Sequence, residues 1–241
     1  DELVEKGISP NKIRMMPRGV DTKKFTPETT YSGQELPEGI RFLFVGRVSK
    51  EKDLPVLERA FKQLSRLRDD VRLIVVGDGP YLKEMRENMA DTPTHFTGYL
   101  QGRELQTIYN ACDIFVFPST TDTFGNVVLE AQAAGVPVIV SDMGGPKENM
   151  IENKTGLIAQ GLDVQSLYKA MLELTENEAK RVSFGTEARE YALTRSLQNS
   201  FEQLWNYYGD EVYAQKKTTE LFQKIAENGF SRMASGQLIE N

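Results

Sequence analysis

The predicted fold depends on one stretch, which reads Val71-Arg72-Leu73-Ile74-Val75-Val76-Gly77-Asp78-Gly79-Pro80. Its apolar residues follow one another without alternation, which is typical of a parallel strand that helices cover on both faces. Two glycines then end the strand, and Pro80 is placed to open a helix. Residues 114–117, Ile-Phe-Val-Phe, repeat the apolar pattern and stop at Pro118. Both segments favour an α/β domain with a parallel sheet.

Strands and helices alternate through six cycles around these two segments. We expect strands at residues 40–45, 71–76, 95–97, 113–117, 137–141 and 156–159, and helices at residues 54–67, 80–89, 104–111, 125–134 and 146–152. This order predicts a doubly wound, Rossmann-like parallel sheet. Further helices are expected at residues 164–174, 179–193 and 197–213, before a polar, weakly helical tail at residues 214–241.

The first 38 residues do not fit this alternation. They contain the end of a helix, a short strand at residues 13–16 and a stretch rich in Thr, Glu, Gly and Pro at residues 28–39, which is typical of a linker. We therefore expect residues 1–38 to be the last piece of a preceding domain with its interdomain linker. Residues 39–196 then form the Rossmann-like domain, and residues 197–241 form a crossing helix with a polar tail.

The composition excludes several classes of function. The 241 residues carry a formal net charge of -6, whereas a nucleic-acid coat or a protein of anionic membrane surfaces is expected to be basic. No apolar run approaches the ~20 residues of a membrane helix, and we expect no signal peptide. We expect a cytoplasmic location and no nucleic-acid partner.

One cysteine and one histidine limit the available chemistry. Cys112 cannot form an intrachain disulfide, and its apolar surroundings predict a buried structural thiol rather than a nucleophile. His95 lies within or beside an expected strand, where a packing or hydrogen-bonding role is favoured over catalysis. A His/Cys metal site has almost no ligands to draw on, so no metal site is predicted.

A ligand site is expected where the strands of the sheet end. Open parallel sheets bind ligands at the carboxyl ends of their strands, near the point where the strand order reverses. This rule selects the loops at residues 46–52, 77–80, 98–100, 118–125 and 141–146.

The loop at residues 46–52 concentrates positive charge. Gly46 permits a tight turn, Arg47 offers a planar fork of donors, and Lys52 adds a point charge directly after a buried strand. A solvated basic turn is the alternative interpretation. The position at the carboxyl end of a strand favours a phosphate site.

The loop at residues 118–125 gives the strongest signal. A strand stops at Pro118 and a helix starts near Gly125, so the free helix amides point into the crevice and form an anion site. Asp122 precedes this helix and Glu130 lies in its second turn. A partly buried Glu130 needs donors, which a ribose diol supplies. Alternatively, Asp122 caps the helix and Glu130 is a surface charge.

Two glycine-rich loops are open to more than one interpretation. Gly77-Asp78-Gly79-Pro80 follows a strand and is expected to face the crevice, but Leu82 breaks the dinucleotide-binding fingerprint. Gly144-Gly145 either lets the backbone approach a ligand or forms a simple turn.

Several segments together resemble one known family. They read Val45-Gly46-Arg47 through Lys52, Val76-Gly77-Asp78-Gly79-Pro80, Asp122-Thr123-Phe124-Gly125 through Glu130-Ala131, Ala134-Gly135-Val136-Pro137-Val138, Asn153-Lys154-Thr155-Gly156-Leu157 and Gly19-Val20-Asp21. Over about residues 8–210 the chain is similar to the carboxyl-terminal half of a retaining, nucleotide-sugar-dependent glycosyltransferase of the GT-B fold, in the group 1 family (family four). The resemblance implies transfer of a hexosyl group from a UDP- or GDP-sugar to an unknown acceptor, without a metal or another cofactor.

The resemblance also implies roles for individual residues. It assigns Arg47 and Lys52 to the donor pyrophosphate, Glu130 to the ribose and Asp122 to the sugar, and these four are the predicted catalytic residues. The other predicted donor-binding residues are Gly46, Gly77, Tyr99, Leu100, Thr123, Phe124, Gly125 and Asn126. Of these, Tyr99 and Leu100 would address the base. Asp122 stands where the family pattern has Glu, which shortens its reach by one methylene.

A preceding acceptor-binding half is the partner that the resemblance implies, and peripheral membrane contact would occur through that half. Because the two halves close over the reacting groups, the chain alone is expected to transfer nothing at a useful rate. A nucleotide-sugar epimerase of the same fold and a non-catalytic nucleotide-sugar-binding domain are the alternatives. An epimerase needs acid/base groups in the crevice, for which His95 is poorly placed.

Overall fold

Two compact units make up the chain in the computed structural model, Gly19–Leu197 and Asp1–Arg18 together with Gln198–Asn241. The structure describes residues 2–14, 18–28, 30, 33 and 35–234. Within that part of the chain, no helix is both long and apolar enough to cross a membrane.

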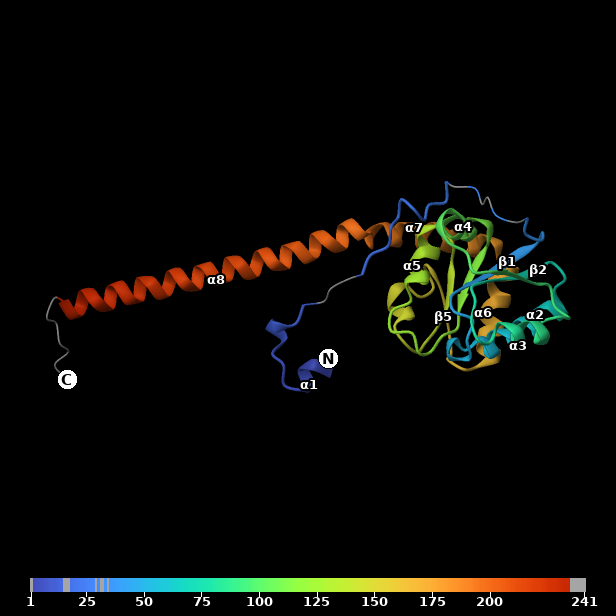
Figure 1. Ribbon diagram of the computed structural model, residues 1–241, viewed down its shortest axis with the longest axis horizontal. Coiled ribbons are helices and arrows are strands. Elements are labelled where there is room, and N and C mark those ends of the chain that lie inside the picture. Colours follow the sequence, from blue (N-terminus) through green and yellow to red (C-terminus); the bar gives the residue numbers. More distant parts are fainter. Residues whose placement is uncertain (1, 15–17, 29, 31–32, 34, 235–241) are drawn as a thin grey trace. The chain divides into compact units, whose positions relative to one another are not determined.

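A six-stranded parallel sheet forms the centre of the Gly19–Leu197 unit (Figure 1). Its strands are β1 (Ile40–Val45), β2 (Val71–Val76), β3 (Thr94–Gly98), β4 (Ile114–Phe117), β5 (Val138–Ser141) and β6 (Gly156–Ala159). They lie in the order β3-β2-β1-β4-β5-β6, and each neighbouring pair is parallel. The order reverses between β1 and β4, so the loops that follow these two strands flank a crevice at the carboxyl edge of the sheet.

The apolar strands fill the core of this unit. Leu73, Ile74, Phe115 and Val116 are fully buried, because helices cover the sheet on both faces. Burial of one such side chain stabilises the fold by roughly 1.5–3 kcal/mol. The sheet is therefore a rigid support for the loops at its edges.

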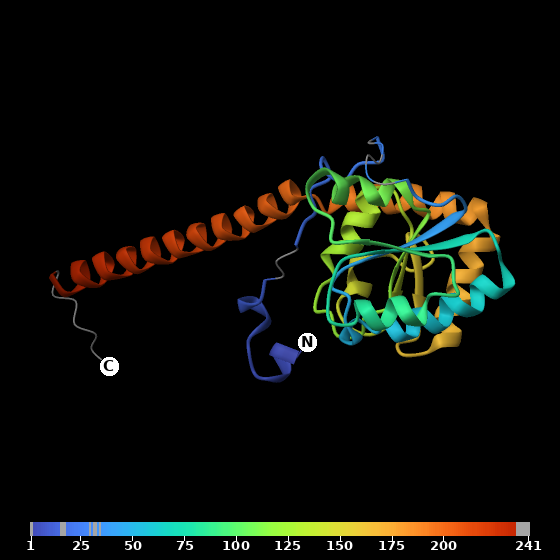
Figure 2. The ribbon, with the colours of Figure 1, turned by 45° about the vertical axis from the view of Figure 1, so that its right-hand side comes forward.

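The helices of this unit lie on both faces of the sheet. They are α2 (Leu54–Leu67), α3 (Leu82–Asn88), α4 (Gly102–Ile108), α5 (Asn126–Ala133), α6 (Val164–Glu176) and α7 (Glu178–Thr194), with the short 3-10 helices η2 (Lys50–Lys52), η3 (Tyr109–Ala111) and η4 (Pro146–Asn149). Helices α2, α3 and α6 cover one face, and α4, α5 and α7 cover the other (Figures 1 and 2). Along α2, Leu57, Phe61 and Leu64 recur at helical spacing and are fully buried, so this stripe faces the core.

The predicted fold class is confirmed, and the six strands differ from their predicted bounds by at most one residue. The helix predicted at residues 80–89 begins later, at Leu82, because the Tyr81 N–H donates to the carbonyl of Val48 (3.0 Å) and holds a turn there. The helix predicted at residues 146–152 is only the 3-10 helix η4.

The other unit contains α1 (Glu2–Glu5), η1 (Pro10–Lys12) and nearly all of α8 (Leu197–Ala234). The first residue of α8, Leu197, belongs to the sheet unit. The strand predicted at residues 13–16 is not present at Ile13 and Arg14, and its other two residues lie outside the described residues. The polar tail was predicted to be weakly helical, yet α8 continues to Ala234. The segment after residue 213 contains no proline and is rich in Lys, Glu, Gln and Ala, whose helix propensities together favour continuation.

The segment before β1 packs on the sheet domain. The Val20 N–H donates to the carbonyl of Arg195 (2.9 Å), Leu36 is buried in the main core, and Phe25 packs against that core. Residues 19–37 therefore belong to the same compact unit as the sheet. The boundary near residue 38 stays a prediction of where the two halves of the larger fold meet.

Candidate functional site

The candidate site lies at the carboxyl edge of the sheet, where the strand order reverses. The loop after β1 carries Arg47 and Lys52, and the loop after β4 carries Asp122. Because β1 and β4 are neighbours in the sheet, loops separated by about seventy residues of sequence meet there.

Lys52 and Asp122 form an ion pair across the crevice. The Lys52 Nζ lies 2.6 Å from the Asp122 Oδ2, and the two side chains are 20% and 23% exposed. These residues were predicted separately, one for a phosphate and one for a sugar, and the structure brings them into contact. The pair presents a cation and an acceptor at one position, while the partial exposure leaves room for a ligand to compete for either group.

Arg47 is more accessible than Lys52. Its Nη1 lies 3.8 Å from the Glu51 Oε1, and both side chains are more than half exposed, so this pair is weak. The Arg47 guanidinium is therefore available for an anion at the rim of the crevice.

A cavity of about 290 Å³ opens beside Arg47. It is lined by Val45, Gly46, Arg47, Val76, Gly77, Asp78, Tyr99, Leu100 and Leu105. Five of the predicted site residues share this lining, and most of the other side chains are apolar. Tyr99 is 73% exposed, so its ring stands at the mouth of the cavity and can cover a flat, partly apolar group.

The structure shows why the loop after β2 has glycine at position 77. Gly77 has a φ of 135°, and a Cβ there would lie 1.9 Å from the carbonyl oxygen of Gly46. Glycine is needed at this point because the loops after β1 and β2 touch through their backbones. Both glycines line the cavity, so backbone forms this part of its wall.

The loop that leads into α5 is held from the side by the loop after β5. The Gly145 N–H donates to the carbonyl of Asp122 (2.8 Å), and a Cβ at Gly145 would lie 1.9 Å from the carbonyl oxygen of Thr123. The Asn149 amide donates to the carbonyl of Phe124. Gly144-Gly145 therefore supports the candidate site through the neighbouring loop backbone.

Helix α5 presents its amino end to the crevice. Gly125 is its N-cap residue, with a φ of 76°, and no side chain caps the helix there. The first amides of α5 lack partners within the helix, as at any helix amino end, and they create a local positive potential. The side chains of Thr123 and Asn126, which flank this end, are exposed.

Glu130 receives a hydrogen bond that the sequence did not reveal. The Tyr109 hydroxyl donates to the Glu130 Oε2 (2.6 Å), and the Phe25 ring packs edge-on against Tyr109, with centroids 5.6 Å apart. Burial raises the pKa of Glu130, and the Tyr109 hydrogen bond opposes that rise. Burial also raises the pKa of the Tyr109 phenol well above its usual range, so Tyr109 stays protonated and acts as a donor.

Glu130 also lines a second cavity, of about 320 Å³. Its lining consists of Gly19, Val20, Asp21, Lys24, Phe25, Gly102, Leu105, Gln106, Asn126, Glu130 and Leu197. Leu105 borders both cavities, so they are neighbours. The contribution of Asp21, Lys24 and Tyr109 was not predicted, because nothing in their local spacing connects them with α5.

The remaining candidate groups lie away from the crevice or are inert. Cys112 is buried, and burial raises the pKa of its thiol, as expected for a structural residue. His95 lies in β3 opposite Ile74 of β2. Among the residues that the structure describes, no cluster of three or more His, Cys, Asp or Glu side chains is arranged to hold a metal ion.

The comparisons with known proteins agree on one family. Residues 31–191 match the model of the family "Glycosyl transferases group 1". A GDP-mannose-dependent alpha-mannosyltransferase of Corynebacterium glutamicum is 35% identical over 217 residues, which cover 88% of this chain and 50% of that protein. A sulfoquinovosyl transferase of Arabidopsis thaliana is 32% identical over 203 residues, covering 79% of this chain and 38% of that protein. The chain thus spans half or less of the length of these two relatives.

Solved structures show the same fold. The C-terminal domain of a glycosyl transferase group 1 family protein from Francisella tularensis has a TM-score of 0.65 and 21% identity, covering 73% of this chain and 98% of that chain. An Anabaena protein in complex with UDP and glucose has a TM-score of 0.71 and 20% identity, covering 86% of this chain and 59% of that chain. The chain therefore belongs to the group 1 glycosyl transferases, and its sheet domain is the carboxyl-terminal half of their GT-B fold.

Proposed function

We propose that the Gly19–Leu197 unit binds the donor of a retaining glycosyltransferase, a nucleoside diphosphate that carries a hexosyl group. The observation that carries this proposal is the Lys52–Asp122 ion pair at the point where the strand order reverses. The apolar cavity lies on the side of Arg47, and Glu130 lines the neighbouring cavity. Groups suited to a diphosphate, a base and a ribose are therefore close together.

The diphosphate would occupy the positive centre of the crevice. Arg47 is exposed, the Lys52 ammonium donates to the Asp122 carboxylate, and the amino end of α5 adds amides that have no partner within the helix. An anion that enters can accept hydrogen bonds from all three without breaking any backbone contact. Asp122 would then be released toward the sugar hydroxyls, together with the exposed Thr123 and Asn126.

The nucleoside would use the two cavities. The apolar cavity beside Tyr99 and Leu100 suits a base, which needs a flat surface and few polar contacts. Glu130 has one carboxylate oxygen bound by Tyr109, and its other oxygen can accept a ribose hydroxyl. Relatives are described as GDP-mannose-dependent, and one structural neighbour holds UDP, which supports a UDP- or GDP-sugar as the donor.

The chemistry follows from the charges. When the bond between the sugar and the phosphate breaks, negative charge develops on the departing diphosphate, and Arg47, Lys52 and the α5 amides stabilise it. The resemblance to retaining enzymes implies attack of the acceptor on the same face, with the diphosphate accepting the acceptor's proton. None of these steps uses a metal, and the proposal is a metal-independent transfer.

Transfer would need the other half of the fold. Because the chain spans about half of its relatives, we propose that a preceding acceptor-binding half closes over this crevice and excludes water. One relative is described as a phosphatidylinositol monomannoside mannosyltransferase, which supports contact with a membrane through that half. The isolated chain is expected to bind the donor and to be inactive in transfer.

The two alternatives predict different results. An epimerase would require acid/base groups at the sugar, and His95, in β3, is absent from the residues that line the two cavities described above. A non-catalytic binding domain would bind the donor equally well but would not support transfer when joined to the acceptor half.

Calorimetry with the 241-residue chain tests the proposal. UDP, GDP, uridine and guanosine are titrated in turn, and at least one diphosphate is expected to bind tenfold or more tightly than its nucleoside, since a charge-assisted hydrogen bond contributes about 1.5–3 kcal/mol. Absence of binding by both diphosphates would overturn donor binding. A transfer assay on the complete protein, with and without an acceptor extract, then separates transferase, epimerase and inactive binder.

A further inference from the structure

Three consecutive residues after β1 are bonded to three consecutive residues after β4. The Thr121 hydroxyl donates to the carbonyl of Glu51 (2.9 Å), and the Lys52 ammonium donates to Asp122 (2.6 Å). Both the N–H and the hydroxyl of Thr120 donate to the Asp53 Oδ2, at 2.8 and 2.7 Å. Of these three contacts between the loops, the Asp53 contact is the one that involves the backbone of the second loop.

Asp53 has an unusual conformation for this contact. It stands at the amino end of α2, where an aspartate normally accepts hydrogen bonds from the free amides of its own helix. Its side chain makes no such capping bond, and its backbone is left-handed, with φ 54° and ψ 29°. Among the described residues, Asn153 and Leu162 are the other non-glycine positions with positive φ. The carboxylate is thus directed across the crevice, at the expense of its usual capping role.

We propose that Asp53 is a positioning residue that holds the loop before α5 at the distance at which Lys52 and Asp122 flank the donor diphosphate. This inference rests on the proposed function. A preformed loop spares the ligand the entropic cost of ordering it, so the hydrogen bonds to Thr120 increase affinity without touching the ligand. The same two hydrogen bonds from Thr120 partly offset the negative charge of the Asp53 carboxylate, which would otherwise repel an incoming phosphate.

The test compares two substitutions that relieve the same backbone conformation. Asp53→Gly fits a φ of 54° and removes the carboxylate, whereas Asn153→Gly fits a φ of 58° in the loop before β6, at the amino edge of the sheet. We expect Asp53→Gly to weaken binding of UDP or GDP about five- to tenfold, because the ligand must then order the loop itself. Binding of the nucleoside should not change, and Asn153→Gly should change neither.

A conservative substitution at the same position should recover the diphosphate affinity. Asp53→Asn tolerates the left-handed backbone and retains an amide oxygen that can accept from Thr120, so it should restore diphosphate affinity to within about threefold of the unmodified chain. Wild-type diphosphate affinity in Asp53→Gly would overturn the inference. An equal loss for nucleoside and diphosphate would also overturn it, because it would indicate a general loss of structure.

Amide hydrogen exchange separates this inference from the proposed function. Exchange at Thr120 should accelerate in Asp53→Gly and stay unchanged in Asn153→Gly, with or without any nucleotide. Failure of UDP and GDP to bind the unmodified chain would contradict donor binding, and this exchange result would still stand. Unchanged exchange at Thr120 in Asp53→Gly would overturn the tether itself.

Discussion

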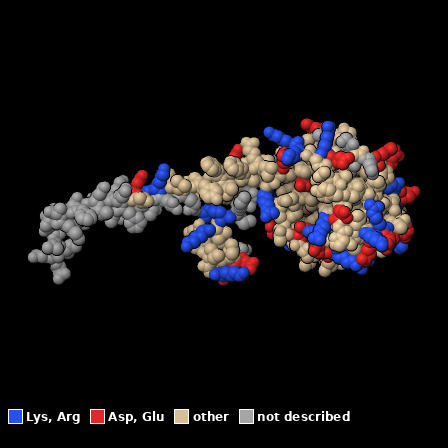
Figure 3. Space-filling model, viewed as in Figure 1, with Lys and Arg blue, Asp and Glu red and all other residues tan. Residues whose placement is uncertain are grey.

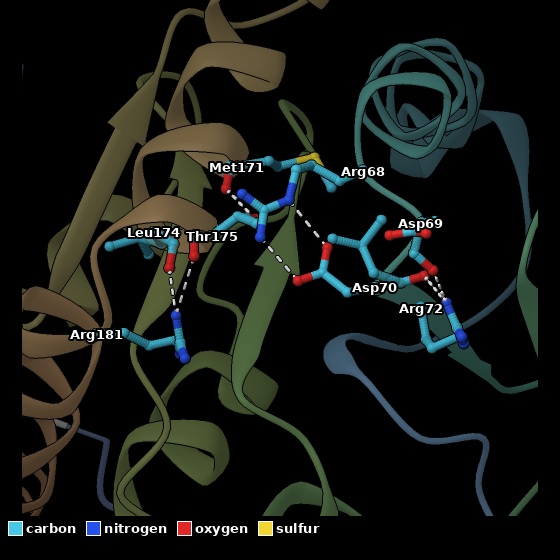
Figure 4. Close-up of polar contacts among 9 residues, drawn as sticks. Arg68, Asp69, Asp70, Arg72, Met171, Leu174, Thr175 and Arg181 are labelled. Carbon is cyan, nitrogen blue, oxygen red and sulfur yellow. Dashed lines mark hydrogen bonds and ion pairs between the residues drawn. The ribbon is translucent and has the colours of Figure 1, made fainter.

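Several cationic side chains at the two edges of the sheet have different kinds of hydrogen-bond acceptor. At the amino edge, the Arg41 guanidinium donates to the carbonyls of Pro37 (2.8 Å) and Ala111 (3.0 Å), and Arg181 donates to the carbonyl of Leu174 (2.8 Å) at the end of α6. Figure 4 shows Arg181 directed at this helix end. These arginines complete the hydrogen bonding of the backbone.

Two other arginines at the amino edge bond to residues that are near them in the sequence. Arg68 donates to both carboxylate oxygens of Asp70, at 2.9 and 2.7 Å, and this hydrogen bonding lowers the pKa of Asp70 (Figure 4). Arg72 next to it donates to the carbonyls of Asp69 and Val71. The contacts stabilise the turn between α2 and β2.

At the carboxyl edge, the three cations of the loop after β1 contact carboxylate side chains. Lys52 pairs with Asp122, and Lys50 pairs with Glu84 at 2.8 Å. On the face of the sheet domain drawn in Figure 3, basic and acidic side chains are interspersed. A carboxylate side chain can rotate away when an anion arrives, whereas a backbone carbonyl cannot move without disturbing the fold. An anion can therefore recruit Lys52 more easily than Arg41 or Arg181, whose acceptors are backbone carbonyls.

The largest expected effect is on stability, at Arg189. Its guanidinium donates to the carbonyls of Thr22, Phe25 and Ala133 and so joins three segments. Arg189→Ala should lower the free energy of unfolding by about 2–4 kcal/mol, because it leaves several carbonyls without a donor. Urea denaturation measures this loss. Arg47→Ala is the matched control and should stay within about 0.5 kcal/mol of the unmodified chain.

The second effect is on binding, at the carboxyl edge. Arg47→Ala and Lys52→Ala should each weaken binding of UDP or GDP roughly tenfold to a hundredfold, with little change for the nucleoside, since each removes a charge-assisted hydrogen bond. Calorimetry with diphosphate and nucleoside checks this. Equal losses for both ligands would show that these cations do not contact the phosphates, and the contrast between the two edges would fail.

A smaller effect concerns Glu130, the half-buried acid beside the crevice. Glu130→Gln should reduce discrimination between ribose and deoxyribose nucleotides several-fold, about 1 kcal/mol for one weakened hydrogen bond. Burial raises the pKa of Glu130, so discrimination by the unmodified chain should fall as the pH drops through that raised pKa, while the variant shows a flat profile. Calorimetry at several pH values measures both, and unchanged discrimination would remove Glu130 from the ribose.

The stability of the same variant has a definite sign. Because the folded pKa of Glu130 is raised above its ordinary value of 4.5, the folded protein retains the proton longer than the unfolded chain. This contribution to stability is present at low pH and is lost as the pH rises through the folded pKa. Glu130→Gln should therefore be at least as stable as the unmodified chain at pH 7. A marked loss of stability there would indicate that the carboxylate is structural.

The smallest expected effect is none at all. Addition of EDTA should leave the affinity for UDP or GDP unchanged, because the proposed diphosphate contacts come from Arg47, Lys52 and the α5 amides. Calorimetry with EDTA and with added Mg²⁺ tests this. Strict dependence on Mg²⁺ would mean that the cations of the carboxyl edge do not suffice for the diphosphate.

The sequence alone determined the sheet domain. Apolar runs such as residues 71–76 and 114–117 can only be buried on both faces, and glycine or proline at their ends marks the loops. The rule that ligands bind at carboxyl ends then selected the edge of the sheet at which we place the candidate site. Helix ends were less certain, as the late start of α3 and the length of α8 illustrate, because local turns and summed propensities compete there.

Only the tertiary structure decided which side chains meet. Asp53 and Thr120 are 67 residues apart, and Lys52 and Asp122 are 70 residues apart, distances over which periodicity carries no information. Their contacts depend on β1 and β4 being neighbours and on the left-handed turn at Asp53. The hydrogen bond from Tyr109 to Glu130 likewise joins two separate elements, η3 before β4 and α5 after it. A sequence pattern records the periodicity of each element, whereas a binding site depends on how separate elements pack together.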